Sequence, residues 1–300
     1  MTHSHDHAHS ATGRNRGRLT VVLAITVTIL AVELVGAVIT GSLALYADAG
    51  HMATDAAGIA LALFAVWIAA RPTTDDRTYG YYRAEILAAA VNAVVLFLLG
   101  AFILYKAVTH LVDPIDVESG PMAIFGLVAV AGNAVSLLLL RHAQAESLNV
   151  RGAFLEVFSD FLGALAVVLA AVIVMVTGFH RADAIASMVI GFMILPRTWR
   201  LLRDAVDVLL EATPRGMKLE DVRGHILETP GVDAVHDLHV WTITSGMPVI
   251  SAHVTVAEGA SHGEVLDQLG SCLAHHFDIE HSTFQLESPG HQDHEGSLHA

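Results

Sequence analysis

The stretch SLALYADAGHMATD, residues 42–55, decides how this chain is interpreted. It begins an apolar run that continues to Ala70 and is long enough to cross a membrane as one helix. Asp48, His51 and Asp55 are spaced three and four residues apart, so a helix places all three on one stripe. Ionisable groups at membrane depth cost at least ~2.5–3.5 kcal/mol each, so their presence indicates a functional site.

A second pair of acids lies in another apolar run, residues 147–177. Glu156 and Asp160 are spaced i, i+4, as His51 and Asp55 are, so each pair presents its side chains one helical turn apart. One imidazole and three carboxylates form a suitable ligand set for a divalent metal ion. The spans hold too few basic residues to neutralise these acids, so we expect a metal ion or protons to balance the charge.

Other polar residues in the apolar runs are weaker candidates. The alternative for the ionisable residues of both runs, the candidate ligands included, is that they only pair with each other and hold helices together. Asp48, Glu33 and Asn92 are each either a residue that supports the metal ligands from behind or an ordinary interhelical hydrogen-bonding residue. Asp183 is expected to cap a helix or lie at the interface rather than to bind metal.

The composition is that of a polytopic membrane protein. Of 300 residues, 54% are hydrophobic and 15% are charged, and the mean hydropathy is +0.56. The single Cys272 excludes an intramolecular disulfide and a thiolate metal site. The first eighteen residues are polar and the first apolar run is long enough to span, so we expect no cleavable signal peptide. Six transmembrane helices are predicted, over residues 19–40, 43–70, 84–111, 121–140, 147–177 and 182–202.

The basic residues predict the orientation of these spans. Eleven arginines lie on one side of the membrane: before span one, between spans two and three, between spans four and five, or at and after the end of span six. Arg197 is counted with the last of these groups. Lys106 and Arg181 lie on the opposite side. The positive-inside rule therefore predicts a multi-pass protein of the cell (inner or plasma) membrane with both termini in the cytoplasm.

The C-terminal segment is predicted to be a water-facing domain. From Ala212 onwards it contains 13 acidic and 3 basic residues, which argues against nucleic acid as a partner. A helix, two Val- and Ile-rich strands joined by Ser245-Gly246, a helix capped by Ser261 and a last strand follow one another. This αββαβ order predicts a small α+β domain after an all-α transmembrane domain. Its small size favours a homodimer, which buries more surface.

Histidines are abundant at both ends of the chain. The run HSHDHAHS, residues 3–10, either collects metal loosely or is a bystander tail. In the C-terminal domain, His236, His253 and His281 are candidate ligands of a regulatory metal ion, and the alternative is that they are ordinary surface residues. His236 and His239 are expected to point to opposite faces of their strand.

Five motifs in this order and spacing resemble those of one known family. They are SLALYADAGHMATD (42–55), TYGYYRAEI (78–86), NVRGAF (149–154), DVLLEATP (207–214) and VHDLHVWTITSGMPVISAHV (235–254). The chain thereby resembles the cation diffusion facilitators, proton-coupled exporters of zinc and other divalent metals. The resemblance covers nearly the whole chain. It implies a homodimer with six spans per protomer and a metallochaperone-like cytoplasmic domain.

The resemblance also implies the transport site and the division of the chain. Two residues from span two and two from span five would form the site, here His51, Asp55, Glu156 and Asp160. Zinc members usually have His where this chain has Glu156, and the hard oxygen would shift selectivity towards Mn, Fe or other oxygen-preferring metals. Zinc remains the first expectation, with Cd and Co also possible, because zinc accepts carboxylates. The expected parts are a His-rich tail (1–18), a transport domain (19–210), a cytoplasmic metal-binding and dimerisation domain (211–288) and a His-containing tail (289–300).

The expected activity is secondary active export of a divalent metal ion from the cytoplasm in exchange for protons. The sequence lacks a GxxxxGK[ST] motif, which argues against ATP as the energy source. Ligands that lose protons to bind metal can couple both fluxes. No cofactor is expected besides the transported and regulatory metal, and the expected partners are metal ions, protons, the lipid bilayer and a second copy of the chain.

Two other functions are weighed against transport. An intramembrane metalloenzyme would use the same ligands, but the sequence has no HExxH motif and no obvious spare base. A cytoplasmic metal sensor or storage protein would use the C-terminal domain and the histidine tails, but it leaves the ligands in the apolar spans unexplained.

Overall fold

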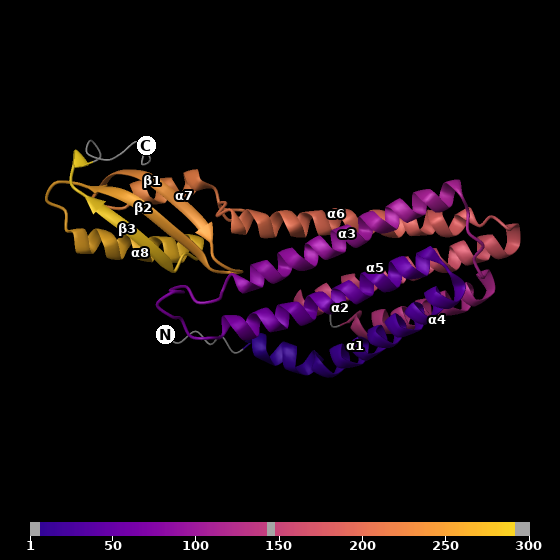
Figure 1. The fold of residues 1–300 in the computed structure, drawn as a ribbon. Helices are drawn as coiled ribbons and strands as arrows, with labels where there is room; N and C mark the ends of the chain where they lie inside the picture. Colours follow the sequence, from indigo (N-terminus) through magenta and orange to yellow (C-terminus); the bar gives the residue numbers. More distant parts are fainter. Residues whose placement is uncertain (1–6, 143–147, 292–300) are drawn as a thin grey trace. The chain divides into compact units, whose positions relative to one another are not determined.

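The structure, a computed structural model, describes residues 7–142 and 148–291. It divides into two compact units, of which the first holds residues up to Ala60 together with Asn92–Arg200, and the second holds Leu61–Val91 together with the chain from Leu201 onwards. Figure 1 shows the elements in chain order. His3 and His5 of the N-terminal run, and residues 292–300 of the C-terminal tail, lie outside the described residues.

Six helices in the described part of the chain are long and apolar enough to cross a membrane, which confirms the six predicted spans. Gly41 follows the first helix with φ +68°, and Gly178 follows the fifth with φ +69°. Glycine adopts this left-handed conformation at little cost and so ends both helices. The helices are α1 (His7–Thr40), α2 (Leu43–Ala69), α3 (Ala84–Val112), α4 (Ser119–Leu140), α5 (Leu148–Thr177) and α6 (Arg181–Leu209).

Two of these helices are longer than the sequence predicts. Helix α1 begins at His7 rather than at residue 19, so part of the polar N-terminal segment continues the helix. Helix α6 continues to Leu209 rather than ending at residue 202, although Pro196 lies inside it and lacks the backbone N–H that a helix interior uses. Arg197 therefore lies twelve residues before the end of this helix, instead of the five expected from the predicted span.

In the first unit, α4 packs against both α1 and α5 (Figure 1). A Cβ atom on Gly36 of α1 would lie 2.5 Å from the ring of Phe125 on α4. A Cβ atom on Gly132 of α4 would lie 2.8 Å from Ile29 on α1. Membrane helices associate by close packing of small residues, so these glycines allow α1 and α4 to approach.

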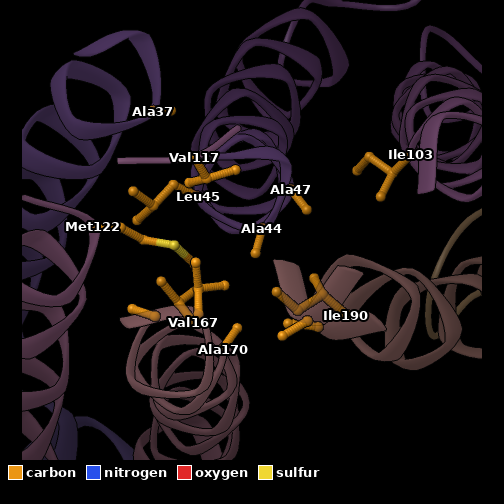
Figure 2. Close-up of a cluster of buried hydrophobic side chains, with 14 of the residues drawn as sticks. Ala37, Ala44, Leu45, Ala47, Ile103, Val117, Met122, Val167, Ala170 and Ile190 are labelled. Carbon is orange, nitrogen blue, oxygen red and sulfur yellow. The ribbon is translucent and has the colours of Figure 1, made fainter. Parts of the chain in front are cut away.

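The core of the first unit is built around small side chains. Leu45 of α2, Met122 of α4 and Val167 of α5 are fully buried and point towards one another in Figure 2. Short alanine side chains fill the rest of the space between the helices, which include α2 and α5, the two that carry the candidate ligands. The alanines of this core include Ala37, Ala44, Ala47 and Ala170.

Asp183 near the start of α6 caps a different helix, α2. Its carboxylate accepts hydrogen bonds from Ser42 Oγ at 2.5 Å, from the backbone N–H of Leu43 at 2.8 Å and from that of Ala44 at 3.3 Å. The first backbone N–H groups of a helix have no partner within it, and a carboxylate at the N-terminus also complements the helix dipole. Asp183 therefore holds the start of α2 against α6.

The C-terminal domain lies in the second unit and has the predicted αββαβ order. The strand order in its sheet is β1-β2-β3, with β1 and β2 antiparallel and β2 and β3 parallel. One hydrophobic core joins both helices to the sheet through residues such as Ile226, Ile250 and Leu269. The elements are α7 (Leu219–Leu227), β1 (Val232–Thr242), β2 (Pro248–Val256), α8 (His262–Phe277) and β3 (His281–Glu287).

Local signals define the ends of these elements. Ser261 caps α8 as predicted, since its hydroxyl accepts a hydrogen bond from the backbone N–H of Glu264. Asp278 ends the same helix in the left-handed conformation, at φ +58°. Gly246, at φ +74°, lies in the turn between β1 and β2.

The start of α3 belongs to the same unit as the C-terminal domain. The Arg83 guanidinium donates to Glu211 at 2.7 Å. Glu85 accepts hydrogen bonds from the hydroxyl groups of Thr244 at 2.6 Å and Ser245 at 3.0 Å. Hydrogen bonds to charged groups are stronger than neutral ones, so these contacts hold the turn after β1 against α3.

We expect Asp183→Ala to destabilise the protein, because backbone N–H groups at the buried start of α2 lose their acceptor. Each unsatisfied buried donor costs about 1–3 kcal/mol. Thermal unfolding of the detergent-solubilised protein should begin at a clearly lower temperature. Asp113→Ala, which removes an exposed carboxylate after α3, is the control and should unfold as the unchanged protein does. Equal unfolding of both variants would contradict the capping role.

Candidate metal sites

Asp48, His51 and Asp55 lie on one stripe of α2, as their spacing predicts. Asp48 and His51 are buried, and Asp55 is half-buried. Nε2 of His51 lies 3.5 Å from Oδ2 of Asp55. One face of α2 therefore presents an imidazole and two carboxylates.

Helix α5 supplies the second pair, Glu156 and Asp160. One ligand atom each from His51, Glu156 and Asp160 lie within 4.8 Å of one another. Asp55 adjoins this group through its contact with His51. The structure thus brings together the four residues that sequence analysis named for a transport site, hereafter the α2–α5 group.

The geometry of the α2–α5 group suits a small divalent ion. Zinc binds nitrogen and oxygen ligands at about 2.0–2.2 Å in a tetrahedral arrangement, so its ligand atoms lie about 3.3–3.6 Å apart. Side-chain movements of less than about 1 Å would close the observed group around such an ion. Oδ1 of Asp160 is buried and has no hydrogen-bond partner among the described residues, so it is available to a cation.

Arg197 of α6 also contacts the α2–α5 group, which the sequence analysis missed. Its guanidinium donates from Nη1 to Oε1 of Glu156 at 3.1 Å and from Nη2 to Oε2 at 2.6 Å. The sequence analysis expected too few basic residues in the spans to neutralise these acids, and it did not pair any of them with Glu156. It placed Arg197 with the arginines at the cytoplasmic end of span six, whereas α6 continues to Leu209. The available signal is the apolar sequence on both sides of this arginine in ILPRTWRLL, residues 194–202.

Asp48 and Glu33 lie behind the ligands. Glu33 of α1 is fully buried, and both of its carboxylate oxygens lack a hydrogen-bond partner among the described residues. Asp48 and Asp160 are its charged neighbours. The Asp48 carboxylate fits against Gly163 of α5, where a Cβ atom would lie 2.5 Å from Oδ1. A glycine at this position is therefore required for α2 and α5 to keep their spacing.

Asn92 of α3 packs against α2 rather than against the candidate ligands. A Cβ atom on Gly58 would lie 2.5 Å from Nδ2 of Asn92, and Gly58 follows Asp55 by about one turn of the helix. Asn92 thus lies close to the backbone of α2 near the α2–α5 group, and it is half-buried.

A small cavity lies between α2, α5 and α6. Its volume is about 20 Å³, and Asp48, His51, Gly163 and Arg197 are among the residues that line it. A cavity needs about 10–15 Å³ measured in this way to hold one water molecule. The cavity therefore has room for a single water molecule or ion beside the α2–α5 group.

A second group of possible ligands lies on the sheet of the C-terminal domain. His236 of β1 and His253 of β2 are paired across the two strands. Their Nε2 and Nδ1 atoms lie 3.4 Å and 3.0 Å from the two carboxylate oxygens of Glu287 on β3. Ligand atoms of all three residues lie within 4.8 Å of one another. The three strands thus form a sheet group of two imidazoles and one carboxylate.

A β-bulge arranges the residues around the sheet group. The pairing of β1 with β2 is irregular between His236 and His239, and Asp237 between them has φ +46°. The Asp237 carboxylate lies 2.8 Å from Nε2 of His239 and 3.6 Å from Nε2 of His253. His239 is exposed while His236 is buried, in agreement with the expectation that they point to different faces.

His281, the third candidate of the C-terminal domain, does not join the sheet group. It begins β3 opposite Val249 and is exposed, and its Nε2 lies 3.3 Å from the hydroxyl of Tyr79. Glu287, at the other end of β3, takes the place that sequence analysis assigned to His281. The signal in the sequence is that an acid ends the predicted last strand of a histidine-rich domain, residues 281–287.

Two family models match the chain. The model of the cation efflux transmembrane domain matches residues 19–210, and that of the cation efflux protein cytoplasmic domain matches residues 214–289. Three curated relatives are similar over most of their length. The metal cation efflux system protein CzcD of Cupriavidus metallidurans is 45% identical, covering 86% of this chain and 82% of that protein. The zinc transporter ZitB of Escherichia coli is 40% identical, with coverage of 86% and 83%. The cadmium, cobalt and zinc/H(+)-K(+) antiporter of Bacillus subtilis is 33% identical, with coverage of 87% and 86%.

We expect Gly163→Ala to lower the thermal stability, because the new methyl group would collide with the Asp48 carboxylate between α2 and α5. Overpacking of a core costs about 1–3 kcal/mol. Gly152→Ala in the same helix is the control, since a Cβ atom there meets nothing within 4 Å, and it should be neutral or stabilising.

Compensation provides a second check on this contact. Shortening the acid by Asp48→Ser in the Gly163→Ala protein should recover part of the lost melting temperature. If the double variant melts no higher than Gly163→Ala alone, the collision with Asp48 is not the cause of the instability.

Proposed function

Because this chain belongs to the cation efflux family, a family of transporters and not enzymes, we propose that it exports zinc from the cytoplasm in exchange for protons. The chain is a multi-pass membrane protein with six candidate spans. One observation carries the proposal: ligand atoms of His51, Glu156 and Asp160 converge between membrane-length helices. Such a group has no evident structural purpose and fits a transported cation.

The choice of zinc rests on the chemistry of the donors. His51 supplies a nitrogen ligand, while Asp55, Glu156 and Asp160 supply carboxylate oxygens. Zinc accepts both kinds of ligand, whereas an all-oxygen site would favour magnesium, calcium or manganese. The names of ZitB and of the Bacillus subtilis antiporter include zinc, and the latter also includes cadmium and cobalt. Cadmium and cobalt are therefore the first competitors to test.

Proton exchange follows from the same ligands. A carboxylate or imidazole must be deprotonated to bind metal, so metal binding releases protons and protonation expels metal. Asp160 and Glu33 have buried carboxylate oxygens without hydrogen-bond partners among the described residues, so each can take up a proton, and at Asp160 that proton would replace the metal ion. The name of the Bacillus subtilis relative includes proton exchange. Metal ions and protons would thus compete for the same ligands, and this competition alone would couple metal export to proton import.

Topology and assembly complete the proposal. The distribution of arginines supports cytoplasmic termini, and the second family model describes a cytoplasmic domain. A domain of this size buries little apolar surface by itself, which supports assembly into a homodimer within the lipid bilayer.

Flux measurements test the transport proposal. We expect the protein in proteoliposomes to move zinc against an opposing proton gradient, with protons moving in the other direction. Asp55→Ala and Asp160→Ala should each reduce zinc flux by at least about tenfold, since mutating even the partners that orient metal ligands costs about 10–100-fold in affinity or activity. Both variants should still insert and assemble. Asp113→Ala, outside the α2–α5 group, is the control. The proposal would be contradicted if zinc moved without dissipating the proton gradient, or if the Asp160→Ala variant transported zinc at a near-normal rate.

We further propose that the sheet group binds a regulatory zinc ion. His236, His253 and Glu287 offer two nitrogen ligands and one oxygen ligand, a set that leaves a fourth position of a tetrahedral zinc ion open. Asp237 lies 3.6 Å from His253. It can orient that imidazole or complete the coordination, as carboxylates beside zinc-bound histidines do.

Calorimetry on the full-length protein tests the regulatory site. In an Asp160→Ala background, which weakens the transport site, we expect His253→Ala and Glu287→Gln to remove zinc binding to the C-terminal domain. His281→Ala is the matched control, because His281 lies at the other end of β3, and it should bind as the background protein does. If His281→Ala loses zinc binding while Glu287→Gln retains it, the ligands are instead His236, His253 and His281, as expected from the sequence.

A further inference from the structure

The contact between Arg197 and Glu156 is more than a chance surface pair. The two nitrogens of one guanidinium fork donate to the two oxygens of one carboxylate, at 3.1 Å and 2.6 Å. This parallel arrangement is the strongest pairing available to arginine, and lysine cannot reproduce it. Arg197 also lines the small cavity that His51 and Asp48 share. The arginine therefore lies beside the α2–α5 group and not on a remote face of α6.

Glu156 lies between the Arg197 guanidinium and the place that a metal ion would occupy. One of its carboxylate oxygens lies within 4.8 Å of ligand atoms of His51 and Asp160, while the carboxylate accepts both hydrogen bonds from Arg197. An ion that enters the α2–α5 group thus meets a carboxylate that is already neutralised.

Formal charges show what this neutralisation does. Asp55, Glu156 and Asp160 together carry −3 when ionised, and His51 is neutral as a metal ligand. A divalent ion would leave a net charge of −1 at membrane depth, where unbalanced charge is costly. With Arg197 included the group carries −2, which a divalent ion cancels in full.

We propose that Arg197 is a permanent counter-cation of the transport site, so that Glu156 and Arg197 together act as one neutral ligand. The inference rests on the proposed function, since it assigns to that site a fifth residue that sets its charge. The Arg197 side chain is 53% exposed in the protomer, so it can follow Glu156 towards the ion without unpacking the core. Arg197 is thus a positioning residue: it acts on the ion through Glu156.

A simple alternative is that the pair only fastens α5 to α6. The two explanations differ in sign. If Arg197 sets the charge, Arg197→Gln leaves −3 at the site and zinc binds more tightly, whereas Glu156→His leaves an unpaired guanidinium beside a group of −2 and zinc binds more weakly. If the pair is only a fastener, both changes damage the site in the same direction.

Zinc transport by the full-length protein in proteoliposomes tests this assignment. We expect Glu156→His to raise KM for zinc by at least about tenfold, and Arg197→Gln to lower both KM and the maximal rate because the ion is released more slowly; one unit charge near an ion at an effective dielectric constant of about 20 has effects of this size or larger. The double variant Glu156→His/Arg197→Gln again carries −2 with four ligands. Its KM should return towards the wild-type value from both single variants.

Arg197→Lys keeps the charge and loses the fork, so its KM should lie closer to wild type than that of Arg197→Gln. Detergent melting curves of all variants identify any that fail to fold. If Glu156→His and Arg197→Gln both raise KM, and the double variant raises it by the product of the two effects, Arg197 is not a counter-cation. That result would leave the proposed transport function intact. Absence of zinc transport by the wild type would overturn both.

Discussion

The cost of burying carboxylates in membrane-length helices governs this structure. Asp183 is compensated by a hydroxyl and two backbone N–H groups at the start of α2. Glu156 is compensated by the guanidinium of Arg197. Asp160 and Glu33 retain buried oxygens without hydrogen-bond partners among the described residues. Since such oxygens are strongly disfavoured in an apolar environment, they are the places where an arriving cation or proton gains most.

Small side chains make this arrangement sterically possible. Gly163 leaves room for the Asp48 carboxylate, and Gly58 leaves room for Asn92. Alanines such as Ala44 and Ala170 line the core between α2 and α5, together with larger side chains such as Leu45 and Val167 (Figure 2). The ligand distances of the α2–α5 group therefore depend on glycines and alanines that carry no chemistry themselves. A substitution at one of them would change the site without touching a ligand.

The C-terminal domain brings similar donors together by different means. Hydrogen bonding between strands aligns His236 with His253, and the parallel strand β3 brings Glu287 beside both. The bulge at Asp237 then places a further carboxylate next to His253. A sheet spaces its neighbouring strands about 4.8 Å apart, so side chains from adjacent strands can converge without the close helix packing that the membrane helices need.

The sequence by itself determined the six spans, the αββαβ order and the two pairs of ligands, because length, apolar composition and i, i+4 spacing are local properties of a chain. The pairing of Arg197 with Glu156 depends on how α6 packs against α5. No local sequence pattern determines which residues of the two helices come to lie side by side. The replacement of His281 by Glu287 followed from the direction of β3, which places one end of the strand beside His253 and the other beside Val249. Asp183 reached the start of α2 across about 140 residues of chain. Contacts between elements far apart in sequence arise only when packing has set their mutual positions, and for this reason the tertiary structure alone decided which charges meet.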